Sequence, residues 1–407
     1  MITHRHLMRF HIEALFAHAE GHLVQVNESA GASAPGFFLG RTAHGAMCRF
    51  QHDVDREVRK EPEAAIRDQS IGDTANIIEP MLDRRGHKRM TITDSDAHPP
   101  SGNDPVIDWL LDADPSIRWQ VMRDLGDTPA EVVAAERSRI ASEGWGSKLL
   151  DLQRPDGHWG DGTATPLWWS NLYTLLFLRD LGLDPTNTRA RTAIDLVRSN
   201  VTWGPEFGDS PFFEGEVEPC INGRVLALGA YFGERSDRLV DRLLSEQLAD
   251  GGWNCEAERG SVRSSFHTTI CVLEGLLAFE QAFGATSPVT DARWRAQEYL
   301  LERHLLRRLS TVDVVAPGWT QLAFPTLWHY DVLRALDYLR ASGVPPDARV
   351  EEAVATVLER RQGDGRWPLD VRHRNTLHQE FAGTVGAANR WITLHALRVL
   401  SWYARRV

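Results

Sequence analysis

The segment FFEGEVEPCINGRVLALGAYFG, residues 212–233, places ionisable side chains directly before an apolar, helix-like run. Glu216, Glu218 and Cys220 lie at the mouth of this run, and Pro219 stands where the helix would begin. A carboxyl group can transfer a proton, and carboxylates and thiolates can bind metal ions. A carboxylate can equally cap a helix that has a proline in its first turn. Both interpretations require a helix that begins near residue 219.

Apolar runs with helical periodicity recur along the second part of the chain. They occupy residues 117–125, 169–182, 220–233, 266–279, 328–340 and 390–403. Their starts lie roughly 50–60 residues apart, which is the range in which repeat architectures occur. More polar amphipathic runs, such as DRLVDRLLSEQL and RVEEAVATVLERR, lie between them. The sequence therefore predicts a mainly α fold, an α/α toroid in which six helical hairpins form a closed barrel.

An open α-solenoid built from the same hairpins is the alternative, and it would be a binding scaffold without catalytic activity. An open array needs polar caps at both of its ends. The last repeat, ANRWITLHALRVLSWY, is as apolar as the repeats in the middle of the chain. This composition favours a ring that closes on itself around a central cavity.

Three of the polar runs end in a glycine turn that carries a tryptophan: QRPDGHWG, QLADGGWN and RQGDGRWP. The first two have the pattern Gln-x-x-x-Gly-x-Trp, at 153–159 and 247–253, and Arg361 takes the glutamine position in the third. Glycine supplies the positive φ that a tight stop after a helix demands. We expect the tryptophan of each turn to cover its own helix–turn junction rather than to line a cavity: Trp159, Trp253 and Trp367.

The first hundred residues have a different character. Residues 1–60 contain short alternating runs, GHLVQVNE and GFFLGRTAHGAMCRF, which predict a small β-rich segment. Residues 61–103 are polar, charged and aperiodic, which is typical of a linker. We therefore expect a β-rich appendage without assigned activity, then a linker, then a toroidal domain over 104–407.

Composition excludes several classes of protein. The net charge is −11, whereas nucleic-acid binding needs a basic stripe. No apolar run has the length that a membrane span requires, and the N-terminal MITHRHLMRF lacks the apolar core of a secretory signal. Four cysteines are too few for a disulfide framework in 407 residues. These features predict a cytoplasmic protein.

The Gln-x-x-x-Gly-x-Trp turns resemble those of the squalene/terpene cyclase and protein-prenyltransferase β-subunit superfamily, over residues 104–407. In detail the chain looks most like actinobacterial proteins labelled squalene cyclase. It is too short for the two-domain squalene cyclases, so the resemblance implies a single toroid. It also implies an enzyme that acts on an isoprenoid, either a prenyl diphosphate or a related polyprenyl chain.

The resemblance to zinc prenyltransferases implies a metal site. In those proteins an Asp-x-Cys pair opens one inner helix, and a histidine within an aromatic-His-Thr pattern opens the next. Here Glu218-Pro219-Cys220 takes the first position, and RSSFHTTICVLEGL places His267 47 residues after Cys220. Glu218, Cys220 and His267 would hold zinc and leave one position open, so that the metal activates a nucleophile or a leaving oxygen. The chain departs from the pattern in having glutamate for aspartate, proline between, and Ile221 for an aromatic residue.

The resemblance to class II terpene cyclases implies a different, metal-free chemistry. These enzymes carry an Asp-x-Asp-Asp motif at the corresponding helix start, where a carboxylic acid protonates an alkene. The local sequence here is Glu-Val-Glu-Pro, 216–219, and no Asp-x-Asp-Asp occurs in the chain. Glu218 would then be the acid, although a helix N-terminus stabilises the anionic form of a nearby carboxylate.

Further residues near the same rim are candidates for substrate binding. Arg224 and Arg263 could hold a diphosphate, and a solvated role is the alternative for Arg263. Aromatic faces stabilise carbocations, and the remaining candidates around the rim are Trp169, Phe212, Phe213, Trp328, His329, Tyr330, Asp331 and Trp391.

Two further cysteines lie near the predicted metal site. Cys271 is one helical turn beyond His267 and is expected to be a small core residue. Cys255 follows a glycine turn and is either a fourth ligand or an ordinary loop residue. Protein prenyltransferases pair with a helical α-subunit, and the sequence does not show whether this chain has a partner subunit.

Overall fold

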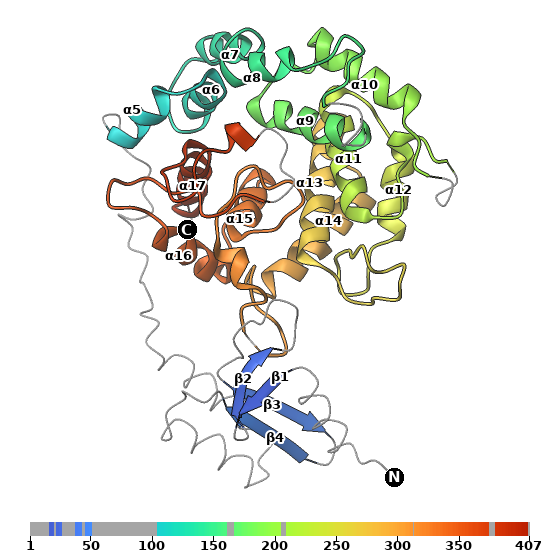
Figure 1. The fold of residues 1–407 in the computed structure, drawn as a ribbon, viewed down its shortest axis with the longest axis vertical. Coiled ribbons are helices and arrows are strands. Elements are labelled where there is room, and N and C mark those ends of the chain that lie inside the picture. The colour runs from blue at the N-terminus through green and yellow to red at the C-terminus, as the bar shows by residue number, and fades with distance from the viewer. Residues whose placement is uncertain are drawn as a thin grey trace. The chain divides into compact units, whose positions relative to one another are not determined.

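The computed structural model describes two parts of the chain (Figure 1). The described residues are 16–19, 22–26, 37–42, 45–50, 104–160, 167–204, 209–311, 313–373 and 379–405. The chain divides into two compact units, Met1–Thr91 and Ile92–Val407. The predicted linker, residues 61–103, lies outside the described residues.

The N-terminal unit contains two β-hairpins. Strands β1 (Phe16–Ala19) and β2 (His22–Val26) pair antiparallel, as do β3 (Phe37–Thr42) and β4 (Gly45–Phe50). In the second hairpin Phe37 lies opposite Phe50, and Thr42 lies opposite Gly45. Strands β2, β3 and β4 lie in the two alternating runs identified in the sequence.

The toroidal unit is built from inner helices and outer helices. The inner helices are α6 (Pro115–Asp124), α9 (Leu167–Leu181), α11 (Pro219–Phe232), α13 (Phe266–Phe283), α15 (Val332–Ala341) and α17 (Arg390–Tyr403). The outer helices are α5 (Pro105–Leu111), α7 (Ala130–Ser138), α8 (Gly144–Asp151), α10 (Thr188–Asn200), α12 (Asp237–Ser245), α14 (Ser287–Leu301) and α16 (Glu351–Glu359). Short 3₁₀ helices are η1 (Arg139–Ala141), η3 (Phe212–Glu214), η4 (Pro317–Thr320), η5 (Ala348–Val350) and η6 (Gln379–Phe381). The predicted mainly α fold is confirmed.

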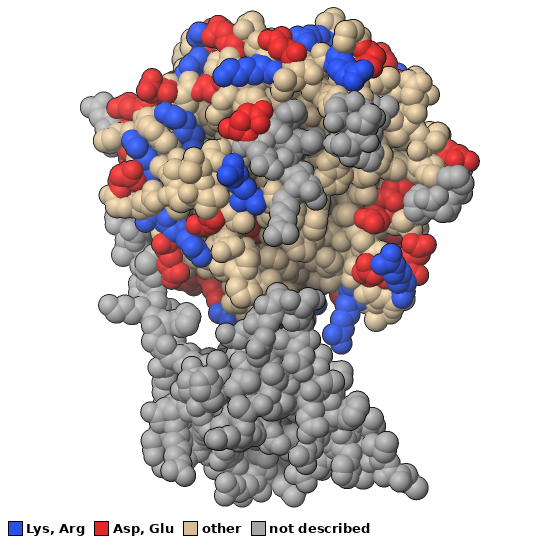
Figure 2. All heavy atoms as spheres, viewed as in Figure 1, with Lys and Arg blue, Asp and Glu red and all other residues tan. Residues whose placement is uncertain are grey.

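Side-chain patterns explain which helices are inner. In α13 most residues are buried, and a helix that is apolar all round belongs in a core. In α12 only Leu239, Val240 and Leu243 are buried, so a single face of that helix meets the core. Within the described residues, no helix combines the length and the apolar character needed to cross a lipid bilayer. On the face shown in Figure 2, acidic and basic side chains are interspersed over the toroidal unit.

Polar side chains define the starts of three inner helices. The side chains of Ser265, Asp331 and Asn389 each accept a hydrogen bond from a backbone N–H in the first turn of α13, α15 and α17. These caps satisfy amide groups that have no partner inside the helix. They fix the ends of the inner helices that face the same rim.

The ring closes between the last inner helix and the first (Figure 1). Arg398 of α17 donates from Nη2 to Oε1 of Gln120 in α6, at 2.8 Å. Arg390 at the start of α17 donates from Nε to the carbonyl oxygen of Trp109 in α5, at 3.2 Å. The two ends of the repeat array are therefore in contact. This confirms the predicted closed toroid and contradicts the open solenoid.

Helices α11 and α13 approach each other backbone to backbone. A Cβ atom on Gly223 would lie 2.4 Å from the carbonyl oxygen of Cys271, and one on Gly275 would lie 2.4 Å from the carbonyl oxygen of Gly223. Only glycine allows such close packing. The contact holds the first turns of α11 beside the middle of α13, so that Arg224 can reach Glu274.

The three tryptophan turns share one geometry. The indole Nε1 of Trp159, Trp253 and Trp367 donates to a carbonyl oxygen ten residues earlier, at 2.7 Å in each case. Each indole is at most 1% exposed, and none lines the central cavity. Gln153 and Gln247 donate to the carbonyl oxygen of the glycine four residues later. The prediction that these tryptophans cover their own turns is confirmed.

Candidate active site

The ring encloses a cavity of about 680 Å³. All six inner helices contribute side chains to its wall, together with the loop 323–327. The volume lies within the range of small-molecule sites, about 300–1,000 Å³. The cavity is therefore large enough to hold an extended organic substrate.

Apolar and aromatic side chains cover much of the wall. Tyr173 and Phe177 of α9 line the cavity, as do Leu277 of α13 and Phe324 of the loop. The rings of Phe177 and Phe324 are 5.8 Å apart. Aromatic faces in such a setting attract a cation through the ring quadrupole. The cavity thus combines an apolar interior with groups that stabilise positive charge.

An arginine–glutamate cluster lies on the α11, α13 and α15 side of the cavity. Glu274 accepts hydrogen bonds from Nε and Nη2 of Arg334, both at 2.8 Å, and from Nη1 of Arg224 at 2.5 Å. Burial alone would raise the pKa of Glu274, but the two guanidinium groups outweigh it and lower the pKa to about 2. Glu274 is thus a permanent anion that holds two arginines in place.

Two more carboxylates of the cavity are in ion pairs. Asp337 accepts from Nε of Arg340 at 2.6 Å and contacts Nδ1 of His395 at 2.9 Å. Burial opposes its ionisation, but Arg340 and His395 hold the pKa of Asp337 below its usual range. Asp180 contacts Nη2 of Arg179 at 2.7 Å. Both carboxylates are therefore paired with arginine, and Asp337 is ionised at neutral pH.

Asp331 is the remaining carboxyl group in the described wall of the cavity, and it differs from the other three. It is 3% exposed and accepts a hydrogen bond from the backbone N–H of Arg334, at 2.8 Å. Among the described residues, no side chain forms an ion pair with it. Burial, the largest influence, raises the pKa of Asp331 to about 6. Asp331 is the carboxyl group of the cavity that can hold a proton.

Of the ten predicted substrate-binding residues, Arg224 and Asp331 line the cavity. Arg263 is exposed and is not part of the wall. Trp169 packs on Tyr173 at a ring distance of 4.3 Å, and Trp391 stacks on Phe324 at 4.5 Å. Neither tryptophan lines the cavity, but each packs against an aromatic side chain that does.

The other predicted aromatics lie in packing clusters. Phe212 is buried and packs against both Phe213 and Trp203. Tyr330 is buried, and its hydroxyl donates to the carbonyl oxygen of Leu305 at 2.5 Å. None of the predicted residues Phe212, Phe213 and Tyr330 belongs to the cavity wall.

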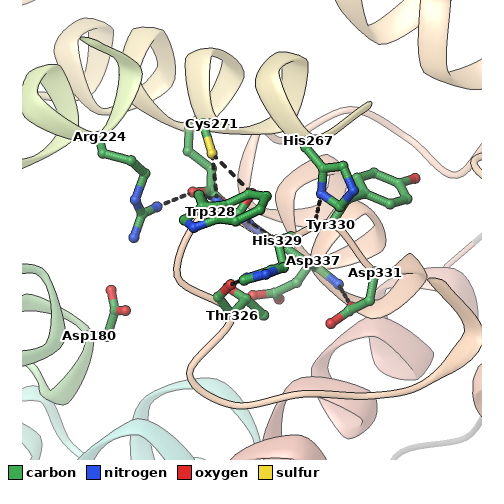
Figure 3. Close-up of polar contacts among 12 residues, drawn as sticks. Asp180, Arg224, His267, Cys271, Thr326, Trp328, His329, Tyr330, Asp331 and Asp337 are labelled. Carbon is green, nitrogen blue, oxygen red and sulfur yellow. Dashed lines mark hydrogen bonds and ion pairs between the residues drawn. The ribbon is translucent and has the colours of Figure 1, made fainter. Parts of the chain in front are cut away.

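A group of imidazole rings lies near the start of α15 (Figure 3). Trp328 stacks on His329 at 3.8 Å. His329 stacks in turn on His373 at 3.6 Å. His267 accepts a hydrogen bond at Nδ1 from the backbone N–H of Tyr330, at 2.8 Å. Burial lowers the pKa of His267 to about 4, so its ring is neutral at pH 7.

The potential metal ligands converge differently from the predicted set. In the described part of the chain, the ligand atoms of Glu218, Cys220 and Cys255 all lie within 4.8 Å of one another. The two Sγ atoms are 3.0 Å apart, and Cys220 Sγ lies 3.7 Å from Oε2 of Glu218. His267 is not a member of this group. Its Nδ1 is bound to Tyr330, whereas Cys255 is held near Cys220 by Thr268, whose Oγ1 is 3.4 Å from Cys255 Sγ.

The surroundings of Glu218 bear on the three roles considered for the EVEPC segment, which are helix cap, zinc ligand and proton donor. Glu218 stands at the N-cap position of α11, but its side chain makes no capping hydrogen bond. It is exposed and is not part of the cavity wall. The neighbouring Glu216 is 4% exposed, and burial raises its pKa to about 7. Cys271 is fully buried, as expected for a core residue.

Sequence reasoning missed several charged residues of the cavity: Arg179, Asp180, Glu274, Arg334, Asp337 and His395. A signal for some of them was present in the sequence. Glu274 and His395 are isolated ionisable residues within apolar runs, ICVLEGLLAF and ITLHALRVL, of helices predicted to be inner. An ionisable group in such a helix must find a partner or a cavity.

No family model matches the chain. The chain is 34% identical to lanosterol synthase of Homo sapiens over 111 residues, which make up 26% of this chain and 14% of that enzyme. The type II terpene cyclase MstE from Scytonema is 16% identical, with a TM-score of 0.37, over 70% of this chain and 86% of the cyclase chain. A variant of MstE in complex with geranylgeranyl dihydroxybenzoate is 18% identical, with a TM-score of 0.36, over 71% and 86% of the two chains.

The sequence motifs, the architecture and the local match point in the same direction. The Gln-x-x-x-Gly-x-Trp turns form repeated caps on a closed ring of helical hairpins. A 111-residue segment matches lanosterol synthase. Over those 111 residues the chain is similar to lanosterol synthase, in agreement with the resemblance to squalene/terpene cyclases that its repeated turns predict.

Proposed function

We propose that the toroidal unit is a terpenoid-cyclase-like enzyme that folds an isoprenoid chain inside the cavity and protonates one of its double bonds. The observation that carries this proposal is the state of Asp331. It is the cavity carboxyl group that is buried without an ion pair among the described residues, while Asp180, Glu274 and Asp337 are paired with arginine.

In the proposed reaction the carboxylic acid of Asp331 gives its proton to an alkene carbon. The π electrons form the new C–H bond, and the neighbouring carbon becomes a tertiary cation. A second double bond of the same chain attacks this cation, so that a ring forms and the charge moves along the chain. The final cation then loses a proton to water and Asp331 takes up a proton from solvent, so that the reaction is an isomerisation overall. Tyr173, Phe177 and Phe324 would stabilise the intermediate cations.

An isoprenoid substrate is supported by the character of the wall and by the local match. The cavity presents aromatic and aliphatic side chains between its charged groups, which suits a long unsaturated hydrocarbon. The matched segment belongs to lanosterol synthase, and lanosterol is itself a cyclised isoprenoid.

Zinc-assisted chemistry is a second candidate, because Glu218, Cys220 and Cys255 converge. Carboxylate and thiolates are suitable zinc ligands, and three of them leave one position open. Two sulfurs bound to zinc at about 2.3 Å would lie about 3.8 Å apart, so the thiols at 3.0 Å must separate slightly. Bound zinc would polarise an oxygen or activate a nucleophile, as in a prenyltransferase. None of the three residues lies in the cavity wall, which favours the cyclase function.

The test of the proposed function is incubation of the purified protein with squalene, geranylgeraniol and prenyl diphosphates, followed by mass spectrometry of the extracted products. We expect a cyclic isomer of at least one substrate from the unmodified protein and none from Asp331→Asn. Glu218→Gln is the matched control, because it removes a carboxylate outside the cavity, and it should form product. Equal product from Asp331→Asn and the unmodified protein would overturn Asp331 as the acid.

Metal analysis of the same preparations separates the two candidates. Under the zinc function, Cys220→Ser loses both bound metal and product. Under the cyclase function, Cys220→Ser forms product at the unmodified rate, whatever its metal content. If no substrate is converted by any preparation, a binding scaffold becomes the better description.

A further inference from the structure

Two thiols meet at the rim of the ring, outside the cavity wall. Cys220 lies in the first turn of α11, and Cys255 lies in the segment that leads from the Trp253 turn to α13. Their Sγ atoms are 3.0 Å apart, although 35 positions separate the two residues in the chain. Both cysteines are free thiols, and neither lines the cavity. The proposed cyclisation therefore gives this pair no role.

The start of α13 holds Cys255 in place. The backbone N–H of Cys255 donates to Oγ1 of Thr268 at 3.4 Å, and its Sγ lies 3.4 Å from the same oxygen. Two residues earlier, the buried Trp253 accepts a hydrogen bond at its carbonyl oxygen from the backbone N–H of Ser265, at 2.8 Å. Because the backbone around Cys255 is anchored to the N-terminal end of α13, its thiol is kept beside Cys220.

The same helix fixes the position of Cys220. Helix α11 packs backbone to backbone on α13 at Gly223, one turn after Cys220. Both cysteines are therefore positioned by contacts with α13, and their separation does not depend on a mobile side chain between them. A disulfide bond has a length of about 2.05 Å, so the two Sγ atoms need to approach by about 1 Å. A small rotation about the Cα–Cβ bonds supplies such a movement.

Solvent access distinguishes this pair from the third cysteine of the toroidal unit. Cys220 and Cys255 are both partly exposed, so a small reagent in solution can reach them. Cys271 is fully buried, and its Sγ lies 3.6 Å from the carbonyl oxygen of Trp328 and 3.5 Å from Nη2 of Arg334. Reaction of a thiol requires exposure as well as a suitable neighbour. Cys220 and Cys255 meet both requirements.

We propose that Cys220 and Cys255 form a redox-active dithiol, which a low-molecular-weight disulfide such as glutathione disulfide oxidises to an intramolecular disulfide. One cysteine attacks glutathione disulfide, forms a mixed disulfide and releases one glutathione. The second cysteine attacks the protein sulfur of that mixed disulfide and releases the second glutathione. The protein thus gives two electrons and two protons to the two glutathione thiols. Because thiolates are the form that binds metal, the disulfide and a zinc ion at these residues exclude each other.

The test is to incubate the whole chain with graded ratios of reduced to oxidised glutathione, with and without a metal chelator, and then to block free thiols and digest with trypsin. Cleavage after arginine places Cys220 in the peptide 199–224 and Cys255 in the peptide 243–259. We expect these two peptides to be joined by a bond that a reductant breaks, in a protein that stays monomeric. Joining only in the presence of the chelator would also support the proposal, because it shows that a bound metal competes for the thiols.

Variants with a single thiol at the rim sharpen the test. Cys220→Ser and Cys255→Ser should each stop at the mixed disulfide, with one glutathione on the remaining thiol. Cys48→Ser is the matched control, since Cys48 belongs to the N-terminal unit, and it should form the joined peptides as the unmodified chain does.

Oxidation should also raise the midpoint of thermal unfolding, and only in chains that hold both rim thiols. A link between residues 35 positions apart constrains the unfolded chain, so we expect an increase of about 5–10 °C. If a serine variant does not fold, the peptide map of the unmodified chain decides alone. Absence of the joined peptides at every glutathione ratio, with and without chelator, would overturn the proposal, as would a bond to Cys48 or Cys271 in their place.

Discussion

The rim and the cavity of the ring hold their ionisable groups in different ways. At the rim, Glu218 is exposed, and it approaches Cys220 and Cys255 without an ion pair among the described residues. In the cavity, Glu274 bridges two arginines across three helices, and Asp331 is buried without an ion pair to any described side chain. The residues that stand out in the sequence are at the rim, because they cluster beside a helix start. The ionisable residues that pair across helices or are buried lie in the cavity, and they are scattered along the chain.

The comparison teaches that two carboxyl groups at helix starts can differ in chemistry, because one faces solvent and the other faces the cavity. A carboxylate at a solvent-facing helix N-terminus is stabilised as an anion by water and by the helix dipole. A carboxyl group in an enclosed wall loses that water, and its neutral form is favoured. Asp331 also lies at a helix start, but it faces the cavity, and burial raises its pKa to about 6.

The largest expected effect of a substitution tests this difference directly. Asp331→Asn should lower product formation by about 10²- to 10⁴-fold, the usual contribution of a general acid. Glu218→Gln, at the rim, should leave the rate unchanged. Steady-state rates of both variants and the unmodified protein on the best substrate measure these effects. A large loss in Glu218→Gln with an active Asp331→Asn would move the chemistry to the rim.

The free energy of unfolding should show the same contrast between the cavity and the rim. Glu274→Gln removes the negative charge that faces Arg224 and Arg334, so it should lower the free energy of unfolding by about 3 kcal/mol. Glu218→Gln should change it by less than about 0.5 kcal/mol, as expected for an exposed side chain. Urea denaturation followed by circular dichroism measures both. Equal free energies of unfolding for the two variants would show that the arginine–glutamate cluster does not stabilise the fold.

The pH dependence of the rate sharpens the assignment of the acid. Protonated Asp331 is the proposed donor, and its pKa is about 6. The protonated fraction therefore falls about tenfold for each pH unit well above 6, and kcat/KM should fall with it. Below pH 6 the rate should level off, provided that circular dichroism shows the protein folded. A rate that rises from pH 6 to pH 8 would exclude a neutral carboxyl group as the donor.

The smallest effect on the reaction is expected from the thiols of the rim. Cys220→Ser and Cys255→Ser should each leave the cyclisation rate unchanged, because neither residue lines the cavity. Metal content is measured in parallel by mass spectrometry. Loss of activity together with loss of zinc in either variant would show that the rim takes part in catalysis.

The fold could be predicted in some detail because its signals are local. The glycine and tryptophan of each turn lie within a few residues of the helix that they end, and Trp253 is buried against its own helix as expected. Closure of the ring was also predictable, because the apolar last helix needs a partner, and α17 finds it in α6. The strands of the appendage followed from alternation of side chains over five or six residues.

The candidate site was only partly predictable, because its contacts join distant segments. Arg224 and Asp331 were identified from their places at helix starts, and both line the cavity. Glu274 was not, since its role depends on Arg334, which lies 60 residues further along the chain. Sequence spacing paired Cys220 with His267, but the structure turns His267 toward Tyr330 and brings Cys255 to the thiol instead.

The sequence by itself determined the mainly α toroid, the order of inner and outer helices and the buried tryptophan turns. These features follow from periodicity and from turn chemistry, which act over a few residues. Only the tertiary structure decided which ionisable groups share the cavity and which remain at the rim. That outcome depends on the rotation of each inner helix and on the close approach of α11 to α13 at Gly223 and Gly275. A rotation of one residue moves a side chain by about 100° around a helix, and a local pattern does not specify it.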